Sequence, residues 1–219
     1  MKKLLAQVLL FPIFFISSCS GQTSPPSSSQ PATLVGGGCD GCEIMYVGMP
    51  EQIGASDTSA AWQEQGRKIL ISGKVLKKDG RTPAPGVILY YWQTDQTGKY
   101  VAGESGKDAA SRHGRLRGWM KTDREGNYAL YTIRPGNYPG ESFPAHIHIA
   151  IKEPGVLNEY YIDDLVFDDD PYLSKAYKDQ QQKRGGNGIL KLAKSGNVET
   201  ATYNIVLGLN IPGYPADSY

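Results

Sequence analysis

Residues 145–151 read Ala-His-Ile-His-Ile-Ala-Ile, so an isoleucine occupies every second position from Ile147 onward. Successive side chains of a β-strand point to opposite faces of its sheet. The isoleucines would therefore share one face, and His146 and His148 the other. This alternation predicts a strand with one buried face. Two imidazoles on the second face suit a metal ion, whereas a hydrogen-bonded pair of surface histidines is the alternative for this short motif alone.

Other short segments of the chain also indicate strands. They are rich in β-branched and aromatic residues, are bounded by turn-forming residues, and lie at 68–76, 87–93, 119–122, 128–133, 159–162, 164–167 and 200–209. Glycine (26 residues) and proline (14 residues) are frequent, and the one stretch that suits a helix is the largely polar segment 170–183. We therefore expect an all-β domain, an antiparallel β-sandwich with long loops and at most short helices.

The N-terminus has the layout of a secretory signal. Two lysines follow Met1, residues 4–16 are mostly apolar, and small residues precede Cys19. The apolar run is shorter than the roughly 20 residues that span a membrane. Residues 1–19 resemble a bacterial lipoprotein signal, in which Cys19 would be lipidated and become the mature N-terminus, and Ser20 favours routing to the outer membrane. The alternative is an ordinary signal peptide with an incidental cysteine. Either interpretation predicts an exported protein, and the lipid would anchor it to a membrane.

Residues 20–38 are rich in Ser, Pro, Thr and Gly and predict a flexible tether, so the folded domain would span 39–219. In an oxidising compartment, the Cys39-x-x-Cys42 pair favours a local disulfide. A redox motif would need a βαβ context, and a zinc site would need a second cysteine pair. The formal net charge of +1 gives no reason to expect a nucleic-acid partner.

Three segments together resemble a known family. Residues 86–100 contain Trp-Gln-Thr-Asp and end Gly-Lys-Tyr, residues 122–139 end Pro-Gly-Asn-Tyr-Pro, and residues 144–148 read Pro-Ala-His-Ile-His. In this order they resemble the intradiol ring-cleavage dioxygenases that act on protocatechuate and catechol. The resemblance covers about residues 68–170, and the combined pattern is far more specific than any one of its parts. It implies the β-sandwich of that family.

The resemblance also implies a metal centre. In that family two tyrosines and two histidines bind ferric iron, and the matching positions are Tyr100, Tyr138, His146 and His148. Phenolate oxygens are hard anionic donors that favour Fe(3+), and imidazoles complete a mixed shell. Tyr138 matches the tyrosine that leaves the iron when substrate binds, and it would accept a proton from a catechol hydroxyl. The implied reaction uses O2 to cleave a catechol-type ring to a muconate-type diacid and needs no organic cofactor.

Phe143 departs from the family pattern, which has an arginine three residues before the first histidine. That arginine is thought to stabilise negative charge on the substrate ring, and a phenylalanine has no charge with which to do so. Candidate substitutes in nearby segments are Arg112, Arg115, Arg117 and Arg134.

A second departure is Asp164, which occupies the position of a family glutamine. A carboxylate there would disfavour acidic catechols such as protocatechuate. The surrounding acidic residues suggest a solvated loop; they are Asp163, Asp164, Asp168, Asp169 and Asp170. His113 lies in a basic, glycine-containing segment that is either another solvated loop or the mouth of the site.

Two further hypotheses belong to other classes of protein. The first is a catalytically silent β-sandwich of the cell envelope that binds iron or catecholates, and the two departures from the family pattern favour it. The second is a generic transthyretin-like adhesion module, which fits the strands but gives no reason for two tyrosines and two histidines at these positions.

Overall fold

The computed structural model describes residues 34–103 and 109–216. The signal and lipidation site expected in 1–19, and residues 20–33 of the expected tether, lie outside these ranges. In the described part of the chain, none of the helices has the length and apolar character needed to cross a membrane.

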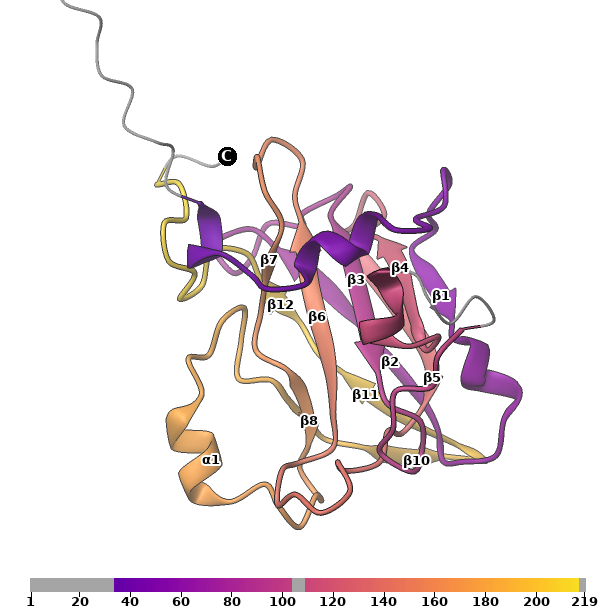
Figure 1. The fold of residues 1–219 in the computed structure, drawn as a ribbon. Coiled ribbons are helices and arrows are strands. Elements are labelled where there is room, and N and C mark those ends of the chain that lie inside the picture. Colours follow the sequence, from indigo (N-terminus) through magenta and orange to yellow (C-terminus); the bar gives the residue numbers. More distant parts are fainter. Residues whose placement is uncertain (1–33, 104–108, 217–219) are drawn as a thin grey trace, which may run out of the picture. The chain divides into compact units, whose positions relative to one another are not determined.

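Two sheets of six strands each make up the fold (Figure 1). The first has the order β1 (Ser56–Thr58), β5 (Asn127–Ile133), β2 (Lys68–Leu76), β11 (Val198–Thr202) and β10 (Ala193–Ser195), with β12 (Ile205–Val206) also paired to β2. The second has the order β4 (Arg117–Lys121), β3 (Ile88–Gln93), β6 (His146–Lys152), β8 (Leu165–Phe167) and β9 (Ile189–Leu190), with β7 (Tyr160–Tyr161) beside β6. The helical elements are short: α1 (Lys175–Gln180) and the 3-10 turns Val35–Gly37, Cys42–Tyr46, Ala60–Gln63 and Ala109–His113.

The two sheets share one apolar core. Ile69 and Ile71 of the first sheet belong to the same buried cluster as Leu89, Ile147 and Ile149 of the second. The alternating isoleucines of β6 therefore point into the sandwich, and His146 and His148 lie on the outer face of the second sheet. The expected all-β sandwich is confirmed. Both sheets are mixed, because β1 runs parallel to β5, β11 and β12 run parallel to β2, and β9 runs parallel to β8.

Most expected strands lie where the sequence places them, and the segment 68–76 coincides with β2. The segment 200–209 forms two strands instead of one, because the side-chain oxygen of Asn204 accepts from the backbone N–H of Lys74 and interrupts the ladder. Within the expected helical stretch only α1 forms; Ser174 caps it by accepting from the backbone N–H of Tyr177.

The folded domain begins before the expected boundary at Cys39. Val35 is buried, and its backbone N–H donates to the side chain of Asn158 at 3.1 Å, so residues 35–37 pack on the domain and are no part of a tether. The sequence did not predict this contact, because Val35 is a single apolar residue followed by three glycines. Cys39 and Cys42 form a disulfide. The segment that follows packs on the outer face of the second sheet, where Met45 belongs to a buried cluster with Tyr90 and Ala150.

Candidate metal centre

The four residues expected to bind metal are brought together by the fold. Tyr100 Oη lies 2.9 Å from Tyr138 Oη, which lies 3.1 Å from His146 Nε2. His146 Nε2 lies 3.2 Å from His148 Nε2, which lies 2.9 Å from Tyr100 Oη. These four atoms, named the donor ring below, close a circuit of two oxygens and two nitrogens from three separate segments of the chain.

Hydrogen bonds behind the histidines fix which nitrogen faces the donor ring. His146 Nδ1 lies 2.8 Å from the carbonyl oxygen of Pro144, and His148 Nδ1 lies 2.8 Å from a carboxylate oxygen of Asp164. Both oxygens only accept, so each Nδ1 carries a proton. A neutral imidazole held in this way presents the lone pair of its Nε2 to the ring. Burial and neighbouring His148 lower the pKa of His146, which favours its neutral form.

The donor ring has too few protons for hydrogen bonds alone. Its four contacts would need four hydrogens, whereas the two phenols supply two and neutral imidazoles with Nδ1 protonated supply none. Burial raises the pKa of Tyr100 and of Tyr138, so both are neutral phenols without a cation. At least two contacts then place lone pairs against each other. A cation at the centre would satisfy all four donors at once.

The spacing of the donors also fits a metal ion. Neighbouring donors lie about 3 Å apart, which is a separation that allows each of them to lie about 2 Å from one shared ion. Two phenol oxygens and two imidazoles form a mixed set that iron accepts, and phenolates favour the ferric state. The residues therefore fit the metal that the resemblance implies. The carboxylate behind His148 is the usual partner of a metal-binding histidine.

Glycines hold the two tyrosine loops together. Gly98 precedes Tyr100 and has a φ of +78°, and a side chain there would overlap the carbonyl of Asn137, next to Tyr138. The backbone N–H of Gly136 donates to the carbonyl of Asp95 at 2.8 Å. This close backbone approach explains the glycines, and it brings the two phenols side by side.

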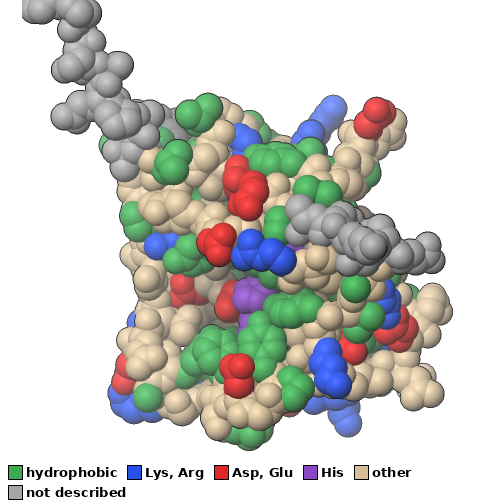
Figure 2. All heavy atoms as spheres, in the orientation of Figure 1, with side chains coloured by type: hydrophobic (Ala, Val, Ile, Leu, Met, Phe, Trp, Pro, Cys, Tyr) green, Lys and Arg blue, Asp and Glu red, His purple; other side chains and the backbone are tan. Residues whose placement is uncertain are grey.

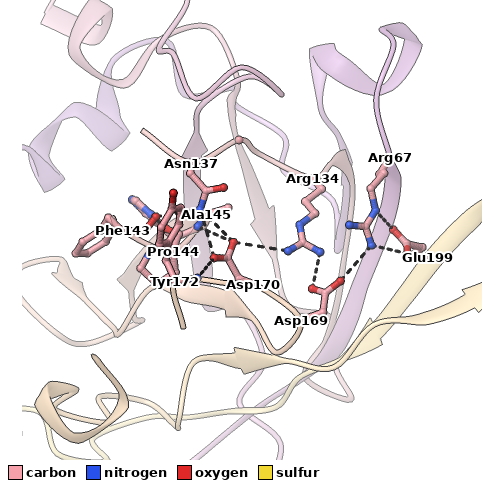
Figure 3. A network of polar contacts seen from close by, with 12 residues as sticks. Arg67, Arg134, Asn137, Phe143, Pro144, Ala145, Asp169, Asp170, Tyr172 and Glu199 are labelled. Atoms are coloured by element: carbon pink, nitrogen blue, oxygen red, sulfur yellow. Dashed lines mark hydrogen bonds and ion pairs between the residues drawn. The ribbon is translucent and has the colours of Figure 1, made fainter. Parts of the chain in front are cut away.

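The buried carboxylate of Asp170 holds two donor segments (Figure 3). It accepts from the side-chain nitrogen of Asn137 at 3.1 Å and from the backbone N–H of Ala145 at 3.1 Å. Asn137 immediately precedes Tyr138, and Ala145 immediately precedes His146. A single side chain, exposed by only 2%, therefore positions two members of the donor ring.

The expectation of a solvated acidic loop is confirmed for Asp168 and Asp169, which are exposed, but it is wrong for Asp163 and Asp170, which are buried. Arg134 pairs with Asp169 at 2.6 Å and approaches Asp170 at 3.7 Å, and Asp169 also pairs with Arg67 (Figure 3). Asp163 is buried as well, and its carboxylate accepts from the backbone N–H of Lys183. Only the folded structure shows that Asp169 and Asp170 lie next to Arg134 and Asn137. The acidic run in the sequence therefore did not reveal that these residues have structural roles.

Phe143 lies beside the donor ring. Its ring centroid is 5.2 Å from that of His146 and 6.4 Å from that of Tyr138. Of the arginines considered as substitutes, Arg134 is engaged behind Asp170, Arg115 pairs with Glu64, and Arg117 donates to the carbonyl of Val47.

The fourth candidate, Arg112, pairs with Asp40 at 3.2 Å. Asp40 lines a hollow of about 300 Å³ together with Trp92, His148 and Asp164. Figure 2 shows histidine side chains in a depression of this face, bordered by hydrophobic and charged side chains. Arg112 is thus the candidate cation at the mouth.

His113 is buried, so the expectation of a solvated loop is wrong for this residue. Its ring stacks on Trp92 at 4.1 Å, and Trp92 stacks on His148 at 4.7 Å. Its Nδ1 lies 2.9 Å from the hydroxyl of Tyr90. Burial lowers its pKa to about 4. The stack therefore supports His148 of the donor ring through Trp92. The sequence shows aromatic residues in segment 87–93, but only the fold reveals that His113 packs against them.

The chain is similar to known proteins in sequence and in fold. A family model described as "Dioxygenase" matches residues 49–208. The chain is 30% identical over 119 residues to the protocatechuate 3,4-dioxygenase beta chain of Burkholderia cepacia, covering 50% of this chain and 48% of that protein. It is 31% identical over 107 residues to the 6-chlorohydroxyquinol 1,2-dioxygenase of Cupriavidus pinatubonensis, covering 42% of this chain and 37% of that protein. The matches thus span less than half of these curated relatives.

A solved structure with a similar fold is the dioxygenase domain of a dioxygenase carbohydrate-binding protein fusion from the cellulolytic bacterium Streptomyces sp. SirexAA-E. It has a TM-score of 0.52 and 26% identity, and the match covers 73% of this chain and 91% of that chain. Catechol 1,2-dioxygenase of Acinetobacter radioresistens shares the fold with a TM-score of 0.56 at 17% identity, over 78% of this chain and 62% of that chain.

Proposed function

Because the chain belongs to the intradiol ring-cleavage dioxygenase family, we propose that it is a non-haem Fe(3+) enzyme that cleaves a catechol-type ring. The reaction would break the bond between the two hydroxyl-bearing carbons and add one oxygen atom of O2 to each of them, giving a muconate-type diacid. The donor ring is the observation that supports this most strongly, because its two phenols and two imidazoles converge as a donor set that suits ferric iron.

Tyr138 is the residue that would exchange with substrate. It lies in a loop between Gly136 and Gly140, whereas His146 and His148 are fixed on β6. Its phenol oxygen is placed to accept a proton from a catechol hydroxyl that takes its position. His146 and His148 stay in place because Pro144 and Asp164 hold their Nδ1 protons.

Aromatic side chains next to the donor ring shape the site and would exclude water from it. Phe143 packs beside Tyr138 and His146, and Trp92 covers one face of His148. These apolar surfaces would limit water around the substrate ring. A ferric ion held by the donor ring would supply a Lewis acid that orients both catechol oxygens and draws electron density from the ring.

A second candidate function is a catalytically silent protein that binds iron or catecholates. The observation in its favour is Phe143, because the family arginine is missing and Arg112, the remaining candidate substitute, is paired with Asp40. The envelope location belongs to the proposal as well: the signal-like residues 1–19 and Cys19 support an exported protein with a lipid anchor.

Oxygen uptake separates the two functions. Iron-loaded protein lacking residues 1–22 would be mixed with catechol or hydroxyquinol, and oxygen consumption and diacid formation would be followed together. The proposed enzyme consumes one O2 per diacid formed, and Tyr138→Phe slows it at least about tenfold because the proton acceptor is lost. Tyr46→Phe is the matched control, since Tyr46 is exposed and bonds Glu159. A change in the iron spectrum on adding catechol, without oxygen uptake, would support the silent binder instead.

A further inference from the structure

A second hollow, of about 240 Å³, lies between α1 and the strands β8 and β9. Its apolar lining consists of Val166, Leu173 and Ile189, and Tyr177 lines it from α1. The other six lining residues are charged or polar, and they include both acidic and basic side chains. In the chain α1 lies between β8 and β9, and Figure 1 shows it on the same side of the fold as β8. The chemistry proposed above makes no use of this space.

The strand register connects this hollow to the donor ring. His146 of β6 pairs with Val166 of β8, and Val166 pairs with Ile189 of β9. Residues paired across neighbouring strands project from the same face, and adjacent strands lie about 4.8 Å apart. The floor of the hollow is therefore the same sheet face that carries His146, continued one and two strands further.

Aromatic side chains connect the lining of the hollow with the donor ring. The Phe143 ring lies 5.2 Å from that of His146 and 5.3 Å from that of Tyr177, in an edge-to-face arrangement with each. Phe143 thus bridges the metal centre and α1. The residue that replaces the family arginine makes this border apolar.

We infer that the hollow receives a substituent of the catechol ring, and that the substrates are catechols carrying an uncharged group about the size of a second aromatic ring. This inference rests on the proposed function. An apolar cavity of about 150 Å³ is enough to hold a benzene molecule, so a hollow of this size and lining accommodates a phenyl group. Burial of that group against Val166 and Ile189 would add binding free energy that plain catechol does not gain.

The charges around the hollow favour a neutral substituent. Asp164 lines it and also accepts from His148 Nδ1, so a carboxylate stands at the end nearest the donor ring. Burial and the charge of Asp164 raise the pKa of Tyr177, as expected where negative charge is disfavoured. Lys178 and Lys183 also line the hollow, and a longer substituent ending in a carboxylate would have to pass Asp164 to reach them.

Binding of three probes tests the inference. Catechol, 4-phenylcatechol and protocatechuate would be titrated into iron-loaded protein without oxygen, and dissociation constants read from the shift of the visible band. We expect 4-phenylcatechol to bind roughly tenfold or more tighter than catechol, and protocatechuate to bind more weakly than catechol. Equal or weaker binding of 4-phenylcatechol, or tightest binding of protocatechuate, would overturn the inference and leave the proposed function standing. Failure of all three probes to bind would overturn both.

A pair of variants locates the binding of the phenyl group. Ile189→Trp fills the hollow from its far end and should abolish the preference for 4-phenylcatechol while changing catechol binding less than about twofold. The matched control is Ile88→Trp, because Ile88 is equally half-buried, lies on the same sheet and lines a different hollow. An unchanged preference in Ile189→Trp, or equal loss in both variants, would contradict the assignment.

Discussion

Replacing Asp170 with asparagine tests whether one buried carboxylate organises the metal centre. One of its oxygens accepts from the backbone N–H of Ala145 at 3.1 Å and from the side chain of Asn137 at 3.1 Å. The other accepts from the backbone N–H of Tyr172 at 2.9 Å. An asparagine has one oxygen and one NH2 group, so either orientation sets the NH2 group against a backbone N–H.

The cost follows from these contacts. A buried N–H left without an acceptor costs about 1–3 kcal/mol, and loss of the charge that faces Arg134 at 3.7 Å adds on the order of 1 kcal/mol. We expect Asp170→Asn to lower the free energy of unfolding by about 2–4 kcal/mol. Because the two anchored segments carry Tyr138 and His146, iron affinity should also fall by roughly tenfold or more.

The assay is urea unfolding of iron-free protein followed by tryptophan fluorescence, together with chelator competition for iron. Asp169→Asn is the matched control, since it removes the same charge from the neighbouring residue. Asp169 is half exposed and pairs with Arg67 and Arg134, so its loss should cost no more than about 1 kcal/mol and spare iron affinity. Equal effects of the two variants on both stability and iron would refute the role given to Asp170.

Other predictions concern pH, loop contact and the disulfide. Burial lowers the pKa of His113 to about 4, so the unfolded state binds its proton first and stability should fall as pH drops from about 6.5 to 4, by up to about 3 kcal/mol. In His113→Asn, the midpoint of unfolding should depend less steeply on pH across this range. An unchanged pH dependence would contradict the role given to His113. Gly98→Ala should abolish stoichiometric iron binding, because the new side chain overlaps the facing loop, whereas Gly140→Ala has a similar φ and open space and should retain iron. Retained iron in Gly98→Ala would count against the loop contact. Reducing the Cys39–Cys42 disulfide should lower the free energy of unfolding by about 2 kcal/mol, a modest value because the closed loop is short. Urea unfolding with and without reductant measures this change, and no change would mean that the disulfide does not stabilise the fold.

The sequence predicted the sandwich because alternation and turn residues are local signals. Residues 145–151 set the face of β6 correctly, and the segment 68–76 coincides with a strand. The parallel pairing of β11 with β2 could not be predicted in this way, since it joins segments more than a hundred residues apart. Val35 was missed because one apolar residue among glycines gives no periodic pattern.

For the candidate site, the donor residues could be named from the sequence, whereas the residues that support them could not. The four donors were named from the resemblance, and the fold brings them within hydrogen-bonding distance of one another. Their supports were not named, because they depend on contacts across the chain. Asp170 looked like part of a solvated acidic run, and His113 looked like a residue of a basic loop, yet both are buried and support donor segments.

Iron binding tests the central claim most directly. Iron-free protein lacking residues 1–22 would be titrated with ferric iron while the visible spectrum is recorded. The donor ring predicts about one iron per chain and a broad tyrosinate-to-iron band. That band should disappear in a double variant carrying Tyr100→Phe and Tyr138→Phe and persist in Tyr46→Phe. Colourless protein that takes up no ferric iron would contradict the metal centre and the proposed function with it.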